Sequence, residues 1–110
     1  MIIGIPKETL SGENRVAASP TSVAALIKLG FTVQIQKGAG TKASFTDEEF
    51  SAADAQLTTK KQCWQADVIF KVNAPTLEEV TQMKEGAHLV SFIAPAQSPE
   101  LLETLRSKSI

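Results

Sequence analysis

Short apolar runs alternate with helix-start signals along the whole chain, and this alternation limits the fold more than any other feature. Residues 2–5 form a β-branched run that ends at Pro6, as a buried first strand does. Ser19 and Pro20 are typical of an N-cap and a first helical position. The pattern then repeats. Strands are expected at 2–5, 31–36, 56–58, 66–72 and 88–93, and helices at 20–29, 46–53, 60–65 and 76–84 and from 98 onward.

Strands separated by helices predict a particular class of fold. Two strands joined through a helix lie parallel in one sheet, and the connecting helices cover its faces. We therefore expect an α/β fold with a parallel, flavodoxin- or Rossmann-like sheet and helices on both faces. The second strand, 31–36, alternates apolar and polar residues, so one of its faces is expected to be less buried.

The composition fits one domain over residues 1–110, with 43% hydrophobic and 21% charged residues. Eleven basic and twelve acidic residues give a net charge of -1, which leaves no basic field for nucleic acid or an anionic membrane. The apolar runs are far shorter than the ~20 residues of a membrane span. Cys63 is the only cysteine, so neither a disulfide framework nor a cysteine metal cluster is possible. We expect a soluble chain from a reducing compartment, without a metal site.

The last residues suggest that the chain continues. Residues 108–110 leave the final expected helix where another strand is due, and a crossover helix has a role only if a strand follows it. We therefore expect the chain to be an N-terminal fragment of a longer protein.

Two cations stand out as candidates for a binding site. Arg15 lies in the polar loop after the first strand, where α/β sheets place their ligands, and it can clamp a carboxylate or phosphate. Lys71 lies near the end of an otherwise apolar strand. Because a buried charge needs a partner, each cation has a structural alternative as an ion pair. The available acids are Glu8, Glu13 and Asp67.

A glycine-rich segment follows the second strand. Residues 38–43 read Gly-Ala-Gly-Thr-Lys-Ala, the outline of a dinucleotide-binding fingerprint. That fingerprint requires a helix to open at the glycines, but the cap signal comes only at Thr46. Lys60 and Lys61 stand where the acidic ribose ligand is expected. A turn between two elements is the favoured interpretation.

Three other residues carry no strong chemical signal. His88 is the only histidine and is expected at the surface at the start of a strand. Ser91 lacks the glycine elbow of a nucleophile. Cys63 precedes Trp64 and is expected in the core. From the residues alone the chain is a parallel α/β domain with a possible anion site, and no reaction follows.

Several segments together resemble the start of the alanine dehydrogenase and nicotinamide nucleotide transhydrogenase α-subunit superfamily. Among them are Ile-Gly-Ile-Pro-Lys-Glu at 3–8, Glu-Asn-Arg-Val-Ala at 13–17 and Lys-Val-Asn-Ala-Pro at 71–75. The likeness also covers 19–20, 29–33, 38–40, 45–50, 64, 66–69 and 89–97. Segments 71–75 and 91–97 are most similar to the proton-pumping transhydrogenases. Asp54 departs from the glycine usual in the family, although aspartate tolerates such a turn better than most residues.

The resemblance implies a role in a larger enzyme. The intact α subunit would bind NAD(H) in a two-lobed, dimeric component, and this chain would form most of the first lobe. Hydride would pass to NADP(H) on a β subunit, coupled to proton movement, at the cytoplasmic side of the bacterial inner membrane. The cofactor-binding residues are then expected beyond Ile110. The chain alone should hold no catalytic residue, show no activity and bind NAD(H) weakly or not at all.

Two alternatives remain open. In an NAD-dependent alanine dehydrogenase, the resemblance implies that Arg15 and Lys71 match residues that bind the carboxylate and carbonyl of the substrate. Those enzymes carry a catalytic histidine at the position of Ala94, which has no titratable group. The other alternative is a non-catalytic lobe that serves packing and dimerisation.

Overall fold

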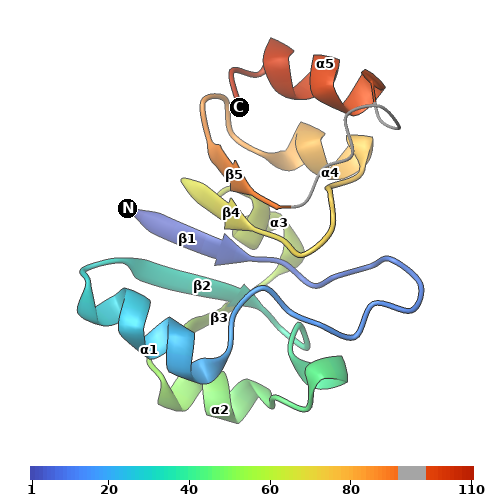
Figure 1. Ribbon diagram of the computed structural model, residues 1–110. Coiled ribbons are helices and arrows are strands. Elements are labelled where there is room, and N and C mark those ends of the chain that lie inside the picture. The colour runs from blue at the N-terminus through green and yellow to red at the C-terminus, as the bar shows by residue number, and fades with distance from the viewer. Residues whose placement is uncertain (92–98) are drawn as a thin grey trace.

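Five parallel strands form a single sheet in the order β3-β2-β1-β4-β5. The structure is a computed structural model and describes residues 1–91 and 99–110 (Figure 1). The strands are β1 (Ile2–Ile5), β2 (Thr32–Gln36), β3 (Gln56–Thr58), β4 (Val68–Phe70) and β5 (His88–Val90). The helices are α1 (Pro20–Lys28), the 3-10 turn η1 (Thr41–Ala43), α2 (Asp47–Ala52), α3 (Lys60–Trp64), α4 (Leu77–Gln82) and α5 (Pro99–Ser107).

The strand order confirms the expected parallel α/β fold and makes it more specific. The chain builds β1, β2 and β3 outward in one direction and then returns to place β4 on the other side of β1. This order, 3-2-1-4-5, is that of a Rossmann-type sheet, whereas a flavodoxin has the order 2-1-3-4-5. The direction of winding therefore reverses between β1 and β4.

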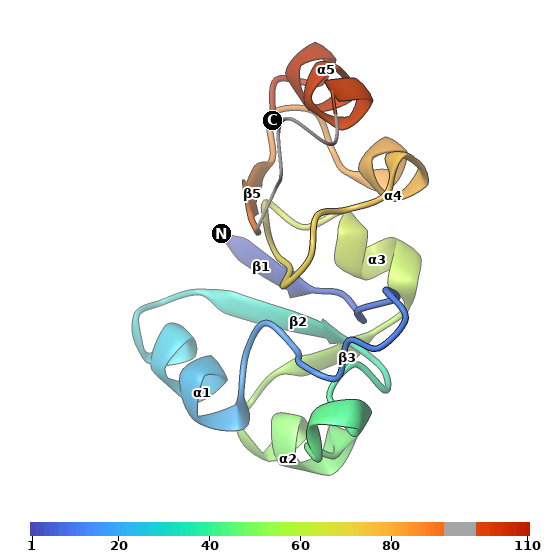
Figure 2. The same cartoon turned by 45° about the vertical axis from the view of Figure 1, so that its right-hand side comes forward.

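Helices cover both faces of the sheet, as predicted. Figure 2 shows α1 and α2 on one side and α3 and α4 on the other. Each strand contributes side chains to both faces of the sheet, because neighbouring residues in a strand point to opposite faces. Ile3 and Ile5 pack in one buried cluster with Val23 of α1 and Phe50 of α2. Ile69 packs in a second cluster that contains Trp64 and Met83.

The helix starts follow local capping chemistry. The side-chain oxygens of Ser19, Thr46 and Thr76 each accept a hydrogen bond from the backbone N–H three residues on, and each forms a full capping box. Thr59 caps α3 in the same way without the reciprocal bond. Each of these capping signals is contained in a stretch of four residues, so it can be recognised without knowledge of the tertiary structure.

The expectation of a less buried face on β2 is confirmed at both ends of the strand, where Thr32 is exposed and Gln36 is half-buried, but it fails at the middle. Gln34, the polar residue at the middle of the strand, is buried, and its carbonyl accepts a hydrogen bond from the Cys63 thiol of α3. Its side-chain amide lies 3.5 Å from Gln56 Oε1. The connection from β3 to β4 has to cross the sheet, and it lays α3 over the face that Gln34 shares.

One strand is shorter than expected, and residues 92–93 of another lie outside the described residues. The strand expected at 66–72 is confined to Val68–Phe70, so Lys71 lies just beyond its carboxyl end. The strand expected at 88–93 is described as His88–Val90. The expected helix cap at Ser98 and the position of Ala94 lie outside the described residues.

The departure from the family pattern at Asp54 has a conformational basis. Asp54 adopts a left-handed backbone, with φ of 71°. Glycine is the usual residue in that region, and aspartate is among the few others that visit it routinely. The turn after α2 is thus formed with aspartate in the glycine position.

Candidate functional site

The carboxyl ends of β1 and β4 meet where the winding of the sheet reverses. In open α/β sheets this reversal opens a crevice in which ligands bind. The loop after β1 contributes Glu8, Glu13 and Arg15, and the segment after β4 contributes Lys71 and Asn73. The sequence predicted a site near Arg15 and Lys71, and both residues are present at this edge.

Lys71 forms a buried ion pair with Glu8. Its Nζ lies 3.0 Å from Glu8 Oε1, and both side chains are almost fully buried. Glu8 also accepts hydrogen bonds from the backbone N–H groups of Val72 (2.9 Å) and Asn73 (3.1 Å). A buried ion pair is tolerated when further hydrogen bonds satisfy its atoms, and Glu8 meets that condition. The pair joins the loop after β1 to the end of β4.

Arg15 is held by Glu13, which lies in the same loop. Its Nε and Nη2 donate to the two carboxylate oxygens of Glu13, at 3.0 and 2.8 Å, in a bidentate arrangement. Its backbone N–H also donates to Glu13, at 2.8 Å. The Nδ2 of Asn73 donates to Glu13 Oε1 at 2.8 Å. The Arg15 side chain nevertheless remains 68% exposed, while that of Glu13 is 8% exposed.

This arrangement sets the charge states of the site. The hydrogen bonds from the Arg15 side chain and backbone, together with that from Asn73, lower the pKa of Glu13 to about 2. The hydrogen bond and charge of Glu13 raise the pKa of Arg15 above its ordinary value. Glu13 is therefore ionised throughout the physiological range, and Arg15 keeps its charge.

A small cavity of about 170 Å³ opens beside Arg15. It is lined by Lys7, Glu8, Glu13, Arg15, Gly38, Ala39, Thr41 and Lys42. Three of these side chains are cationic and two are anionic. Because both acids already bind partners, an added carboxylate or phosphate would meet the basic groups. Lys71 does not line this cavity.

The sequence identified the two cations but not the residues that link them. Both structural alternatives are realised, since Lys71 pairs with Glu8 and Arg15 with Glu13. Asp67, the third acid considered, pairs instead with Lys84 and accepts from the backbone N–H of Ile2 at 2.7 Å. Asn73 was not singled out as a link. Its position two residues after Lys71 is the sequence feature that could have indicated this role.

The glycine segment is a structural turn, as favoured from the sequence. The N–H of Gly38 donates to the side chain of Asp47 at 3.0 Å, so it is already occupied. A Cβ on Gly40 would lie only 2.4 Å from the Phe50 ring, which accounts for glycine there. No α-helix opens at the glycines, and a single 3-10 turn, η1, follows Gly40 instead.

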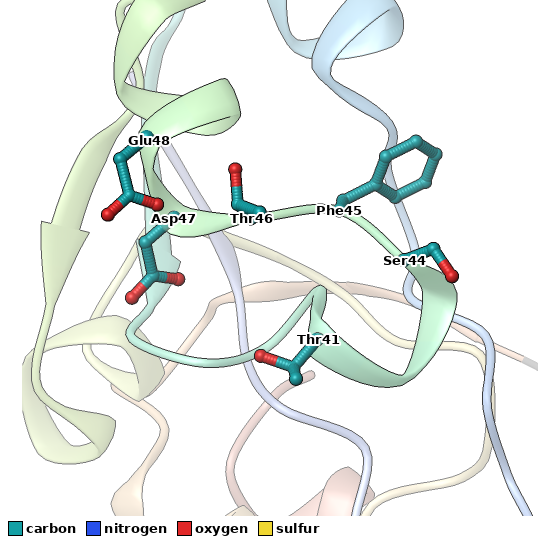
Figure 3. A pocket seen from close by; sticks show the side chains of 6 residues that line it. All are labelled: Thr41, Ser44, Phe45, Thr46, Asp47 and Glu48. Atoms are coloured by element: carbon teal, nitrogen blue, oxygen red, sulfur yellow. The ribbon is translucent and has the colours of Figure 1, made fainter.

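A shallow pocket of about 340 Å³ lies beside this turn (Figure 3). It is lined by Thr41, Ser44, Phe45, Thr46, Asp47 and Glu48. Its only charged lining side chains are two carboxylates, which repel a phosphate rather than bind it. The pocket offers no basic side chain for the phosphates of a dinucleotide.

The remaining candidates hold no site chemistry. Cys63 is buried, and burial raises the pKa of its thiol to about 11, so it stays protonated. His88 is exposed at the start of β5, as predicted. Within residues 1–91 and 99–110, no three His, Cys, Asp or Glu side chains gather in a metal-binding group. In the same ranges, none of the helices has the length and apolar character needed to cross a bilayer.

A Rossmann-type sheet with a cationic crevice at its switch point is typical of a lobe from a nucleotide-dependent dehydrogenase. The chain belongs to the family described as "Alanine dehydrogenase/PNT, N-terminal domain", whose sequence model matches residues 4–110. The resemblance recognised in the sequence is thereby confirmed.

Relatives from both branches of this family are similar to the chain. The NAD(P) transhydrogenase subunit alpha of Haemophilus influenzae is 54% identical over 110 residues, covering all of this chain and 22% of that protein. The alanine dehydrogenase of Bacillus subtilis is 38% identical over all of this chain and 29% of its own length. A solved transhydrogenase from Sinorhizobium meliloti matches 99% of this chain and 33% of its own, with TM-score 0.95 and 33% identity. The chain thus spans between a fifth and a third of these proteins.

Proposed function

We propose that residues 1–110 form the N-terminal lobe of the NAD(H)-binding component of a proton-pumping NAD(P) transhydrogenase. In the intact enzyme, hydride would pass between NAD(H) and NADP(H). The observation that carries this assignment is the 54% identity to the Haemophilus influenzae subunit over the whole chain. The alanine dehydrogenases compared with it are 37–42% identical over nearly the same span.

The partners and location follow from this assignment. The Haemophilus influenzae relative is an alpha subunit, which supports a multi-subunit enzyme. We propose a β subunit that carries the NADP(H)-binding component, a homodimer of the NAD(H)-binding component, and association with the cytoplasmic side of the bacterial inner membrane. The NAD(H)-binding residues themselves are proposed to lie beyond Ile110.

Within the chain, the proposed binding function is an anion site at Arg15. The exposed guanidinium beside a cavity with Lys7 and Lys42 supports contact with a carboxylate or phosphate. Lys71, which is buried against Glu8, would contribute by holding the loop that carries Arg15 rather than by touching the ligand.

Alanine dehydrogenase is the second candidate. A solved L-alanine dehydrogenase matches 97% of this chain with TM-score 0.93 and 36% identity, and an anion site at Arg15 would suit a substrate carboxylate. Ala94 weighs against it, because the absence of an imidazole at that position removes a general acid or base, typically a loss of 10²- to 10⁴-fold in rate.

The two candidates are separated by activity of the intact protein that carries this chain. NADH oxidation is followed with pyruvate and ammonia, and then with an NADP⁺ analogue and the NADP(H)-binding partner component. We expect turnover only in the second assay. Robust turnover in the first and none in the second would replace the transhydrogenase assignment with alanine dehydrogenase.

A further inference from the structure

A continuous series of hydrogen bonds connects the buried Lys71 to the exposed Arg15. Glu8 accepts from Lys71 and from the backbone N–H groups of the two residues that follow it, so its carboxylate fixes the segment after β4. The Asn73 side chain then reaches Glu13, and Glu13 holds Arg15. The series crosses from β4 to the loop after β1 at the switch point.

The Arg15–Glu13 pair, at the exposed end of this series, contributes little to the stability of the fold. An ion pair with a well-exposed partner contributes only about 0–1 kcal/mol, and Arg15 is 68% exposed. The four hydrogen bonds to the Glu13 carboxylate, three from Arg15 and one from Asn73, instead fix the direction of the guanidinium. Glu13 accepts from the Nε and Nη2 edge of Arg15, and Nη1 donates no hydrogen bond within residues 1–91 and 99–110.

We propose that Asn73 is a positioning residue that presets Arg15 for an anionic ligand through Glu13. Its backbone is anchored by Glu8, and its side-chain amide holds the Glu13 carboxylate, which engages the Nε and Nη2 edge of Arg15, so that the ligand would bind at Nη1. This inference rests on the anion site proposed at Arg15. It adds a residue from a different strand end, without which the arginine would sample several orientations and bind an anion less well.

The test uses the 110-residue chain and two readouts. The first is the order parameter of the Arg15 Nε–Hε bond from ¹⁵N relaxation, which reports how firmly the guanidinium is held. The second is the dissociation constant for inorganic phosphate and, separately, for oxalate at fixed ionic strength. The two anions distinguish a phosphate site from a carboxylate site.

Asn73→Ala removes the side-chain link and keeps the backbone anchor on Glu8. We expect the Arg15 order parameter to fall and the anion affinity to drop roughly three- to tenfold, as for the loss of one hydrogen bond. Asn73→Asp, which has nearly the same shape but places a carboxylate against Glu13, should do the same. Asn14→Ala is the matched control, because Asn14 is an exposed asparagine in the loop that carries Arg15, and it should leave both readouts unchanged.

The outcomes separate the two proposals. An Arg15 order parameter that is the same in Asn73→Ala as in the parent chain overturns the positioning role, whatever the anion affinity. Anion binding that is absent, or that survives Arg15→Gln, overturns the anion site, while the order parameter still decides the role of Asn73. A drop in thermal stability with unchanged order at Arg15 would assign Asn73 a merely structural role.

Discussion

Lys71 and Glu8 form an ion pair in which Nζ lies 3.0 Å from Oε1 and the two side chains are only 2% and 3% exposed. The residues are 63 positions apart in the chain and follow different strands. They meet because β4 is placed directly beside β1 in the sheet. The pair therefore couples the formation of the switch point to the docking of β4.

Removing the cation from this pair should destabilise the fold strongly. Lys71→Met leaves the Glu8 carboxylate buried without its counter-charge, and breaking a buried pair typically costs about 3–5 kcal/mol. Guanidinium unfolding followed by the fluorescence of Trp64, the single tryptophan, measures this directly. The control is Lys60→Met at an exposed position, which should stay within about 0.5 kcal/mol of the parent chain. Equal stability of the two variants would contradict a structural role for the pair.

Glu13 should make the fold sensitive to acid. Its folded-state pKa is lowered to about 2 from an ordinary value of 4.5, so its contribution to stability is present above pH 4.5. Protons bind the unfolded state first as the pH falls, and the contribution is lost between these two values. Unfolding curves at a series of pH values should therefore show a smaller decline over this window for Glu13→Gln. An identical pH slope in the variant and the parent chain would show that Glu13 is not held as described.

Gly40 should be required for packing. A Cβ there would lie 2.4 Å from the Phe50 ring and 2.9 Å from the Phe45 carbonyl oxygen. Forcing a methyl group into such a site costs typically about 1–3 kcal/mol, so Gly40→Ala should lower the midpoint of thermal unfolding. In Gly12→Ala the new methyl meets open space, and the cost is confined to the left-handed backbone, with φ of 84°. A smaller loss in Gly40→Ala than in Gly12→Ala would refute the packing explanation.

The 110-residue chain should bind NAD(H) weakly. The glycine segment opens no α-helix, its Gly38 amide is occupied by Asp47, and the pocket lined by residues 44–48 carries only acidic charges. Calorimetric titration with NADH should give a dissociation constant above about 1 mM, equivalent to less than about 4 kcal/mol of binding. A micromolar constant would mean that the glycine segment, and not a later part of the protein, holds the cofactor.

The fold was largely predictable because its signals are local. Capping residues such as Thr46 and Thr76 satisfy N–H groups three residues away, and the β-branched run of β1 needs no partner to be recognised. The burial of Gln34 was missed because it depends on α3 crossing the sheet, which is a tertiary event.

The site was only partly predictable, for a related reason. Charge and position identified Arg15 and Lys71 as candidates. The sequence did not single out Glu8 as the partner of Lys71, since that pairing follows from the order of the strands. The contribution of Asn73 depends on a side-chain direction that only the folded segment after β4 defines.

The central claim, that this chain is a transhydrogenase lobe, is tested most directly by exchanging segments. Residues 1–110 replace the matching segment of the Haemophilus influenzae transhydrogenase alpha subunit, to which they are 54% identical, and in parallel that of the Bacillus subtilis alanine dehydrogenase, to which they are 38% identical. Hydride transfer to an NADP⁺ analogue should survive in the first chimera. Pyruvate amination should be lost in the second, because Ala94 supplies no imidazole. Amination retained in the second chimera, with hydride transfer lost in the first, would contradict the assignment.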